Sequence, residues 1–169
     1  MALSLLDQLY RSLILDHSAN PHHFGQLNHK THEMQLLNPT CGDAVTVEIK
    51  VNDQDRIEAI AFNGEGCTIS IASASLMTDL MVNKTVPEAL DRIKAFTQLV
   101  GGATDSSTEE YSSDQIKDLL GDCAILAGVK QFPARYKCAI LSWRALEFGL
   151  KEDSQDALLD QDGITRKEV

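Results

Sequence analysis

Three short segments of the chain each combine a cysteine with glycine or proline: NPTCGD, GEGCTIS and FPARYKC, which contain Cys41, Cys67 and Cys138. Cys67 follows two glycines where a strand pattern gives way to a helical one, and Cys138 falls on the first turns of the last predicted helix. The start of a helix carries partial positive charge, which favours a thiolate over a thiol. Ionised sulfur is the form that binds metal or attacks, so these cysteines are candidates for either role.

Asp43 lies two positions after Cys41 and completes a donor set that zinc accepts, three thiolates and one carboxylate. The carboxylate is a harder ligand than the thiolates and should exchange more readily. The wide spacings fit no zinc finger, and no CxxC pair occurs. The residues alone therefore leave alternatives open: each cysteine could be a small buried hydrophobic residue, and Asp43 could cap a turn.

Other residues of the same types have simpler interpretations. Cys123 lies in an apolar helical run and is expected to pack in the core. All five histidines fall between His17 and His32, and His29 and His32 could form a second metal site. That segment has the composition of a loop, so solvent-exposed histidines are the preferred interpretation.

Composition limits the function classes. The 169 residues suit one domain, and 15 Lys+Arg against 25 Asp+Glu give a net charge of −10. Without spare positive charge to replace phosphate counterions, we expect no nucleic-acid partner. Asp7, Arg11 and Asp16 interrupt the opening segment, so we expect neither a targeting segment nor a membrane span, and a cytoplasmic protein. In a reducing compartment, four cysteines favour metal or catalytic use over disulfides.

The elements that position these residues follow from hydrophobic periodicity. Residues 3–17 predict an amphipathic helix, and 18–33 a loop. Residues 44–51 and 56–64 alternate as half-buried strands of an antiparallel hairpin, with 34–37 as a third strand.

The second half of the chain predicts helices over 68–84, 87–100, 115–129 and 132–150. Thr85 should cap the second of these and Ser113 or Asp114 the third, and Trp143 and Phe148 should lie in the core. Strands followed by helices indicate an α+β fold with helices on one face of a small sheet.

Taken together, NPTCGD, GEGCTIS and FPARYKCAILSW resemble the U-type iron–sulfur cluster assembly proteins, the IscU/NifU N-terminal family and its SufU branch. The leading YRSLILDHSANPHHFG is similar to the opening of that family. The resemblance implies an IscU/SufU-like α+β fold, in which a three-stranded antiparallel sheet packs against helices. It implies a metal site of Cys41, Asp43, Cys67 and Cys138. It also implies an insertion at about 100–114. From the length and composition of the chain, we expect one domain over 1–150 and a weakly structured tail over 151–169.

Two departures from the IscU pattern indicate a resemblance to the SufU branch of the family. Lys137 stands where IscU proteins carry a histidine, and QFPAR replaces their LPPVK chaperone-recognition segment. The SufU pattern implies a zinc-bound site that serves a SufS-type cysteine desulfurase and, through it, downstream iron–sulfur assembly or acceptor proteins.

The expected mechanism is sulfur transfer, which would make the chain a zinc-dependent sulfurtransferase. If a desulfurase side chain displaced Cys41 from zinc, its thiolate could attack the outer sulfur of a persulfide, and Arg135 would stabilise that thiolate. The alternative is a scaffold that assembles a transient [2Fe–2S] cluster on the same cysteines. A third possibility is a zinc-stabilised adaptor that binds the desulfurase without accepting sulfur.

Overall fold

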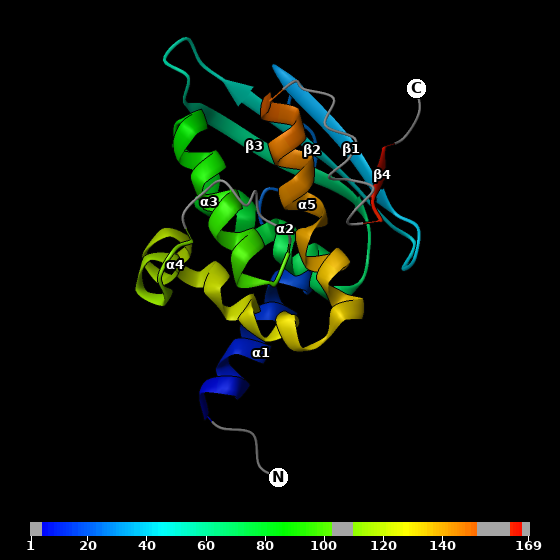
Figure 1. Cartoon of the computed structure of the whole chain (residues 1–169). Coiled ribbons are helices and arrows are strands. Elements are labelled where there is room, and N and C mark those ends of the chain that lie inside the picture. Colours follow the sequence, from blue (N-terminus) through cyan, green and yellow to red (C-terminus); the bar gives the residue numbers. More distant parts are fainter. Residues whose placement is uncertain (1–4, 103–109, 152–162, 167–169) are drawn as a thin grey trace.

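The computed structural model describes residues 5–102, 110–151 and 163–166. The elements follow in the order α1 (Leu5–Ala19), β1 (His32–Asn38), β2 (Asp43–Val51), β3 (Ile57–Glu65), α2 (Thr68–Met81), α3 (Val86–Leu99), α4 (Ser113–Leu120), the 3₁₀ segment η1 (Gly121–Gln131), α5 (Pro133–Lys151) and β4 (Thr165–Arg166). This arrangement confirms the predicted fold class, a small antiparallel sheet packed against helices (Figure 1).

The sheet has the strand order β3-β2-β1-β4, and every neighbouring pair is antiparallel. Val45, Val47 and Ile49 face the core and are fully buried, as their alternation predicts. The opposite face of β2 is more buried than expected from the sequence, which predicts a half-buried strand. Glu48 is only 2% exposed, and Lys30, from the segment before β1, pairs with it at 2.7 Å.

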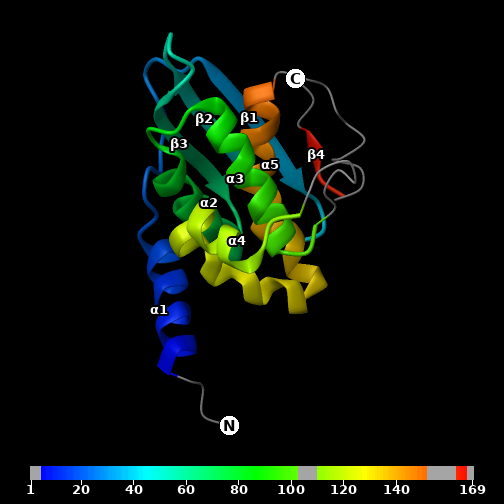
Figure 2. The same ribbon diagram turned by 60° about the vertical axis from the view of Figure 1, so that its left-hand side comes forward.

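Two helices cover one face of the sheet: α5 contacts β1 and β2, and α2 contacts β3 (Figures 1 and 2). The serine- and alanine-rich sequence of α2 allows it to pack closely against α5, and the Ser73 hydroxyl donates to Ala139 O at 2.6 Å. Trp143 Nε1 donates to the same hydroxyl, and its ring stacks on Phe96 of α3 with centroids 3.8 Å apart. The prediction that Trp143 and Phe148 lie in the core is confirmed.

The helix boundaries were only partly predictable. The Thr85 cap is confirmed, since its side chain accepts from Glu88 N–H in a capping box. The single helix expected over 115–129 is wrong: α4 ends before Gly121, whose φ of 52° interrupts it, and a 3₁₀ segment follows. The cap of α4 is Ser112 instead of Ser113 or Asp114.

The predicted insertion and tail fall largely outside the described residues, which omit 103–109, 152–162 and 167–169. Within the tail, Ile164 is buried, and Thr165–Arg166 add a short fourth strand beside Leu36 and Leu37 of β1.

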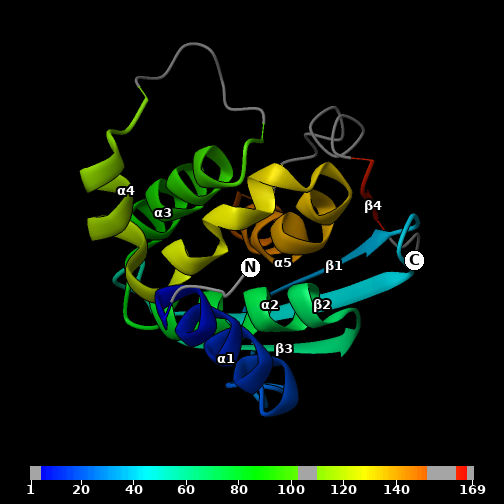
Figure 3. The same cartoon turned by 90° about the horizontal axis from the view of Figure 1, so that it is seen from below.

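The N-terminal helix packs against α2 (Figure 3). Its apolar face is incompletely covered, since Leu9 is 61% and Leu15 is 49% exposed. Among the described helices, none combines the length and the hydropathy needed to cross a membrane.

Candidate metal centre

Three chain segments that are distant in sequence meet at one end of the sheet: the β1–β2 turn, the β3–α2 junction and the N-terminal part of α5 (Figure 1). Each carries one of the three cysteines that the sequence identifies. Antiparallel pairing brings the first two segments together, because β1 ends, β2 begins and β3 ends at the same end of the sheet.

The β1–β2 turn places Cys41 at the surface and Asp43 in the interior. Asn38 and Asp43 are paired at the ends of the two strands, and Gly42 N–H donates to Asn38 O at 2.9 Å. Gly42 adopts a φ of 73°, a left-handed conformation that glycine takes without strain. The turn therefore leaves Cys41 exposed, while Asp43, already within β2, is only 2% exposed.

The β3–α2 junction depends on Gly64. It has a φ of 133°, and a Cβ atom there would lie 2.0 Å from Ala44 O, inside contact distance. This close approach lets the chain turn into α2, where Cys67 is the N-cap residue. The Cys67 N–H donates to Asp43 Oδ1 at 3.0 Å. The backbone of the β3–α2 junction therefore helps to orient the Asp43 carboxylate.

Cys41, Asp43 and Cys138 converge, and their candidate ligand atoms all lie within 4.8 Å of one another. The sulfurs of Cys41 and Cys138 are 3.6 Å apart. Two thiolates bound to one tetrahedral zinc at ~2.3 Å would lie about 3.8 Å apart, so the observed spacing fits such an ion closely. Each Asp43 oxygen has a second lone pair and can bind a metal while it accepts a hydrogen bond.

Cys67, the fourth predicted ligand, lies outside this group of three, but its backbone N–H bonds Asp43 and its thiol contributes to the pKa of Cys138. Burial is the main cause that raises the pKa of Cys138, followed by hydrogen bonds to Cys67, Cys41 and Asp43. The sequence predicts that the helix start lowers the pKa of Cys138, but burial acts in the opposite direction and is the larger effect. A bound divalent cation would reverse this preference because ligating thiols are deprotonated.

Asn38 also belongs to the site, although its residue type and position do not mark it as a ligand. Its side chain is fully buried, and Nδ2 donates to Asp43 Oδ2 at 3.2 Å and to Cys138 Sγ at 3.8 Å. Its Oδ1 has no hydrogen-bond partner among the described residues. The amide thus directs its donors at the two buried candidate ligands, an arrangement that favours negative charge on both.

Two basic residues precede Cys138 on α5. Lys137 Nζ donates to Thr40 Oγ1 at 3.4 Å. Arg135 is exposed on the first turn, and its backbone N–H donates to Phe132 O. A role for Arg135 with the Cys41 thiolate stays a prediction.

The other cysteine and the histidines have mixed outcomes. Cys123 is 2% exposed in the core, as predicted. The expectation of exposed histidines is wrong for His17, which is 5% exposed because α2 covers it and Ser75 Oγ lies 2.7 Å from its Nδ1. His29 and His32 are absent from the metal-type clusters found among the described residues, whereas His17 and His22 form one with Asp79.

Comparison with known proteins finds relatives that are named for iron–sulfur cluster assembly or sulfur transfer. The family model for the NifU-like N terminal domain matches residues 9–139. The iron-sulfur cluster assembly scaffold protein IscU of Streptococcus pyogenes serotype M1 is 44% identical and covers 100% of both chains. The zinc-dependent sulfurtransferase SufU of Bacillus subtilis is 45% identical over 88% of this chain and 93% of its own.

A solved structure agrees with these relatives. A Fervidobacterium islandicum protein, named as an iron-sulfur cluster assembly scaffold for the SUF system, superposes with a TM-score of 0.70 at 30% identity, over 85% of this chain and 97% of that one. Its fold is the α+β fold described above.

Proposed function

Because the chain belongs to the family of NifU-like N-terminal domains, we propose that it serves iron–sulfur cluster biogenesis as a zinc-bound sulfur acceptor. Sulfur would come from the persulfide of a SufS-type cysteine desulfurase and pass to downstream assembly or acceptor proteins. The relatives' names include both a scaffold and a sulfurtransferase, so the proposal depends on the site itself.

The observation that carries the proposal is the unequal exposure of the candidate ligands. Asp43 and Cys138 are buried, whereas Cys41 is exposed at the tip of the β1–β2 turn. A second protein can therefore reach Cys41 while the buried residues remain in place. Such a division suits a residue that leaves and rejoins the site better than it suits a closed structural centre.

Cys41, Asp43, Cys67 and Cys138 would hold the ion. Zinc, when bound, would stabilise the thiolates without redox chemistry of its own. Lys137 supports this set of four ligands over a set that includes a histidine directly before Cys138, because an ammonium group cannot ligate a metal.

The transfer step is a thiol–disulfide-type exchange. The Cys41 thiolate attacks the outer sulfur of the desulfurase persulfide, a new S–S bond forms at Cys41, and the desulfurase cysteine leaves as a thiolate. No external oxidant or reductant is needed. Arg135, three residues before Cys138, would stabilise the attacking thiolate.

Substitution of the acceptor tests this step. Cys41→Ala should abolish both the persulfide on this chain, detected by mass spectrometry, and its stimulation of the desulfurase. Cys123→Ala, which changes a core cysteine, is the control and should retain both. Stimulation that survives Cys41→Ala would contradict the mechanism, and stimulation without a trapped persulfide in the unsubstituted chain would favour the adaptor.

A [2Fe–2S] scaffold is the second candidate, because the same thiolates suit a cluster. Protein purified without added metals separates the two. Colourless protein with about one zinc per chain supports sulfur transfer. Brown protein with iron and acid-labile sulfide supports the scaffold.

We further propose that the desulfurase docks in a groove of about 590 Å³ that α1, the start of α2 and η1 line together. Its rim includes Leu15 and Phe132, which are 49% and 60% exposed. The groove reaches the start of α2, since two of its lining residues, Thr68 and Ile69, directly follow Cys67.

Phe132→Asp should weaken desulfurase binding at least about tenfold, because exposed aromatic residues in such grooves are frequent binding hot spots. Titration calorimetry would measure the dissociation constant. Phe24→Asp is the control, since Phe24 is 52% exposed but lies outside the groove. Equal affinities for the two variants would place the docking surface elsewhere.

A further inference from the structure

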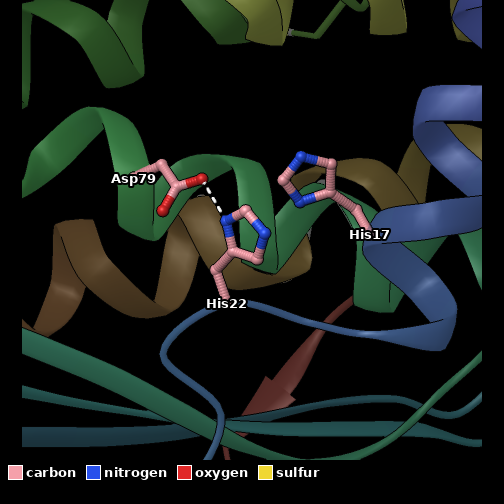
Figure 4. A group of neighbouring side chains, drawn as sticks. All are labelled: His17, His22 and Asp79. Atoms are coloured by element: carbon pink, nitrogen blue, oxygen red, sulfur yellow. Dashed lines mark hydrogen bonds and ion pairs between the residues drawn. The ribbon is translucent and has the colours of Figure 1, made fainter.

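Away from the cysteine cluster, a second group of metal-binding side chains lies where α1 ends against α2. His17, from the last turn of α1, and His22, from the segment that follows, approach Asp79 of α2 (Figure 4). Their candidate ligand atoms all lie within 4.8 Å of one another. These residues differ from His29 and His32, the pair that the sequence suggests for a second metal site.

The contacts within this group are close. His22 Nδ1 lies 2.6 Å from Asp79 Oδ2, and the rings of His17 and His22 have centroids 4.5 Å apart. Figure 4 shows the ring of His22 between the other two side chains. Two imidazoles this close would repel each other if both were protonated, and a neutral imidazole nitrogen is a good metal ligand.

Neighbouring polar groups hold the histidines in place. Ser75 Oγ lies 2.7 Å from His17 Nδ1 and also accepts the backbone N–H of His22 at 2.8 Å. One buried hydroxyl therefore orients both residues, which is the part that outer-shell partners play around metal-binding histidines. His23 approaches the other Asp79 oxygen at 3.4 Å and so helps to orient the carboxylate.

We propose that His17, His22 and Asp79 form a second metal site, which takes a divalent transition-metal ion of borderline softness such as Zn²⁺ or Co²⁺. Two imidazoles and one carboxylate are a donor set that such ions accept, with a remaining position open to solvent. The ion takes the place of the direct contact between His22 Nδ1 and Asp79 Oδ2.

The required movement is small. Bonds of ~2.0 Å to a tetrahedral ion separate two ligand atoms by about 3.3 Å, so His22 and Asp79 must part by less than 1 Å. Both side chains can move, since they are 48% and 40% exposed, whereas His17 is held in the interior. Without a thiolate, this site binds more weakly than the cysteine cluster and exchanges with solvent.

The test uses the full chain with one equivalent of zinc already bound at the cysteines, and Co²⁺ as the probe. Zinc binds more tightly than cobalt, so the cobalt is left to the second site. We expect one further equivalent to bind, with weak d–d absorption, without thiolate-to-cobalt charge-transfer bands, and with paramagnetic broadening of the His17 and His22 ring signals in NMR spectra.

His22→Gln and Asp79→Asn should each weaken cobalt binding at least about tenfold, because each removes a ligand. His29→Gln, which changes an exposed histidine outside the cluster, is the control and should bind as the unsubstituted chain does. The proposal is overturned if no second equivalent binds, if charge-transfer bands accompany it, or if all three variants bind equally. The ring signals of the unsubstituted chain decide the question without any variant.

Discussion

At the scale of single residues, Asn38 is the least expected part of the cysteine cluster. Its amide reaches the two buried candidate ligands, while its own oxygen is buried without a partner among the described residues. An unsatisfied buried acceptor costs about 1–3 kcal/mol. The charge-assisted bond to Asp43 offsets part of that cost, so the interaction is understandable if Asp43 and Cys138 must carry negative charge.

Asn38→Ala should therefore lower zinc affinity about 10–100-fold, the usual effect of losing a partner of a metal ligand. Competition with a chromophoric chelator would measure it. Asn63→Ala is a suitable control, because that side-chain amide donates to Gly25 O and not to a candidate ligand. An unchanged zinc affinity in Asn38→Ala would show that the amide has no part in metal binding.

The candidate ligands could be identified from the sequence because Cys41 and Cys67 each lie next to glycine and Cys138 lies on the first turns of a helix that proline opens. The geometry could not. Asn38 and Cys138 are 100 positions apart, and His17 and Ser75 are 58 apart, so nothing local in the sequence indicates either contact. The quoted motif NPTCGD contains Asn38 but does not show which way its side chain turns.

At the scale of elements, the close contact between β2 and β3 positions Asp43. Gly64 pairs with Val45, and its missing side chain allows the Ala44 carbonyl to lie where a Cβ atom would be. A side chain there would force β2 away from β3 one residue from Asp43.

Gly64→Ala should therefore destabilise the fold by about 1–3 kcal/mol or more through its strained φ and the contact with Ala44. Zinc affinity should fall with it. Urea unfolding would measure the first effect and chelator competition the second. Gly128→Ala is the matched control, because a Cβ atom there meets nothing within 4 Å. Equal stability of the two variants would contradict this account.

Element types were predictable wherever periodicity or a cap was strong, as for the β2–β3 hairpin and for α3 with its Thr85 cap. The predicted helix over 115–129 failed because its apolar pattern continues through Gly121, where the backbone turns to positive φ. The strand β4 was not predictable, since two residues carry no period and their pairing depends on β1.

At the scale of the whole molecule, a metal held by Cys41, Asp43 and Cys138 would join the sheet to the last helix. Binding that requires the folded arrangement contributes its free energy to folding. At a free-ion concentration about 100 times the dissociation constant, this contribution is about 2.7 kcal/mol.

Chelation should consequently lower the melting temperature by about 5–10 °C, as expected for a domain of this size. Differential scanning calorimetry with and without chelator would measure the shift. In Cys138→Ser, which lacks one ligand, the chelator should have a much smaller effect. Identical shifts in both proteins would mean that the stabilising ion binds at a site other than the cysteine cluster.

The stacking of Trp143 on Phe96 has a practical consequence. Trp143 is the single tryptophan of the chain, and it lies on α5 little more than one turn after Cys138. Its indole is fully buried and bonded to Ser73. Ultraviolet emission from this one fluorophore reports the environment where α2, α3 and α5 meet. Loosening of α5 can therefore be followed in real time without attaching a dye.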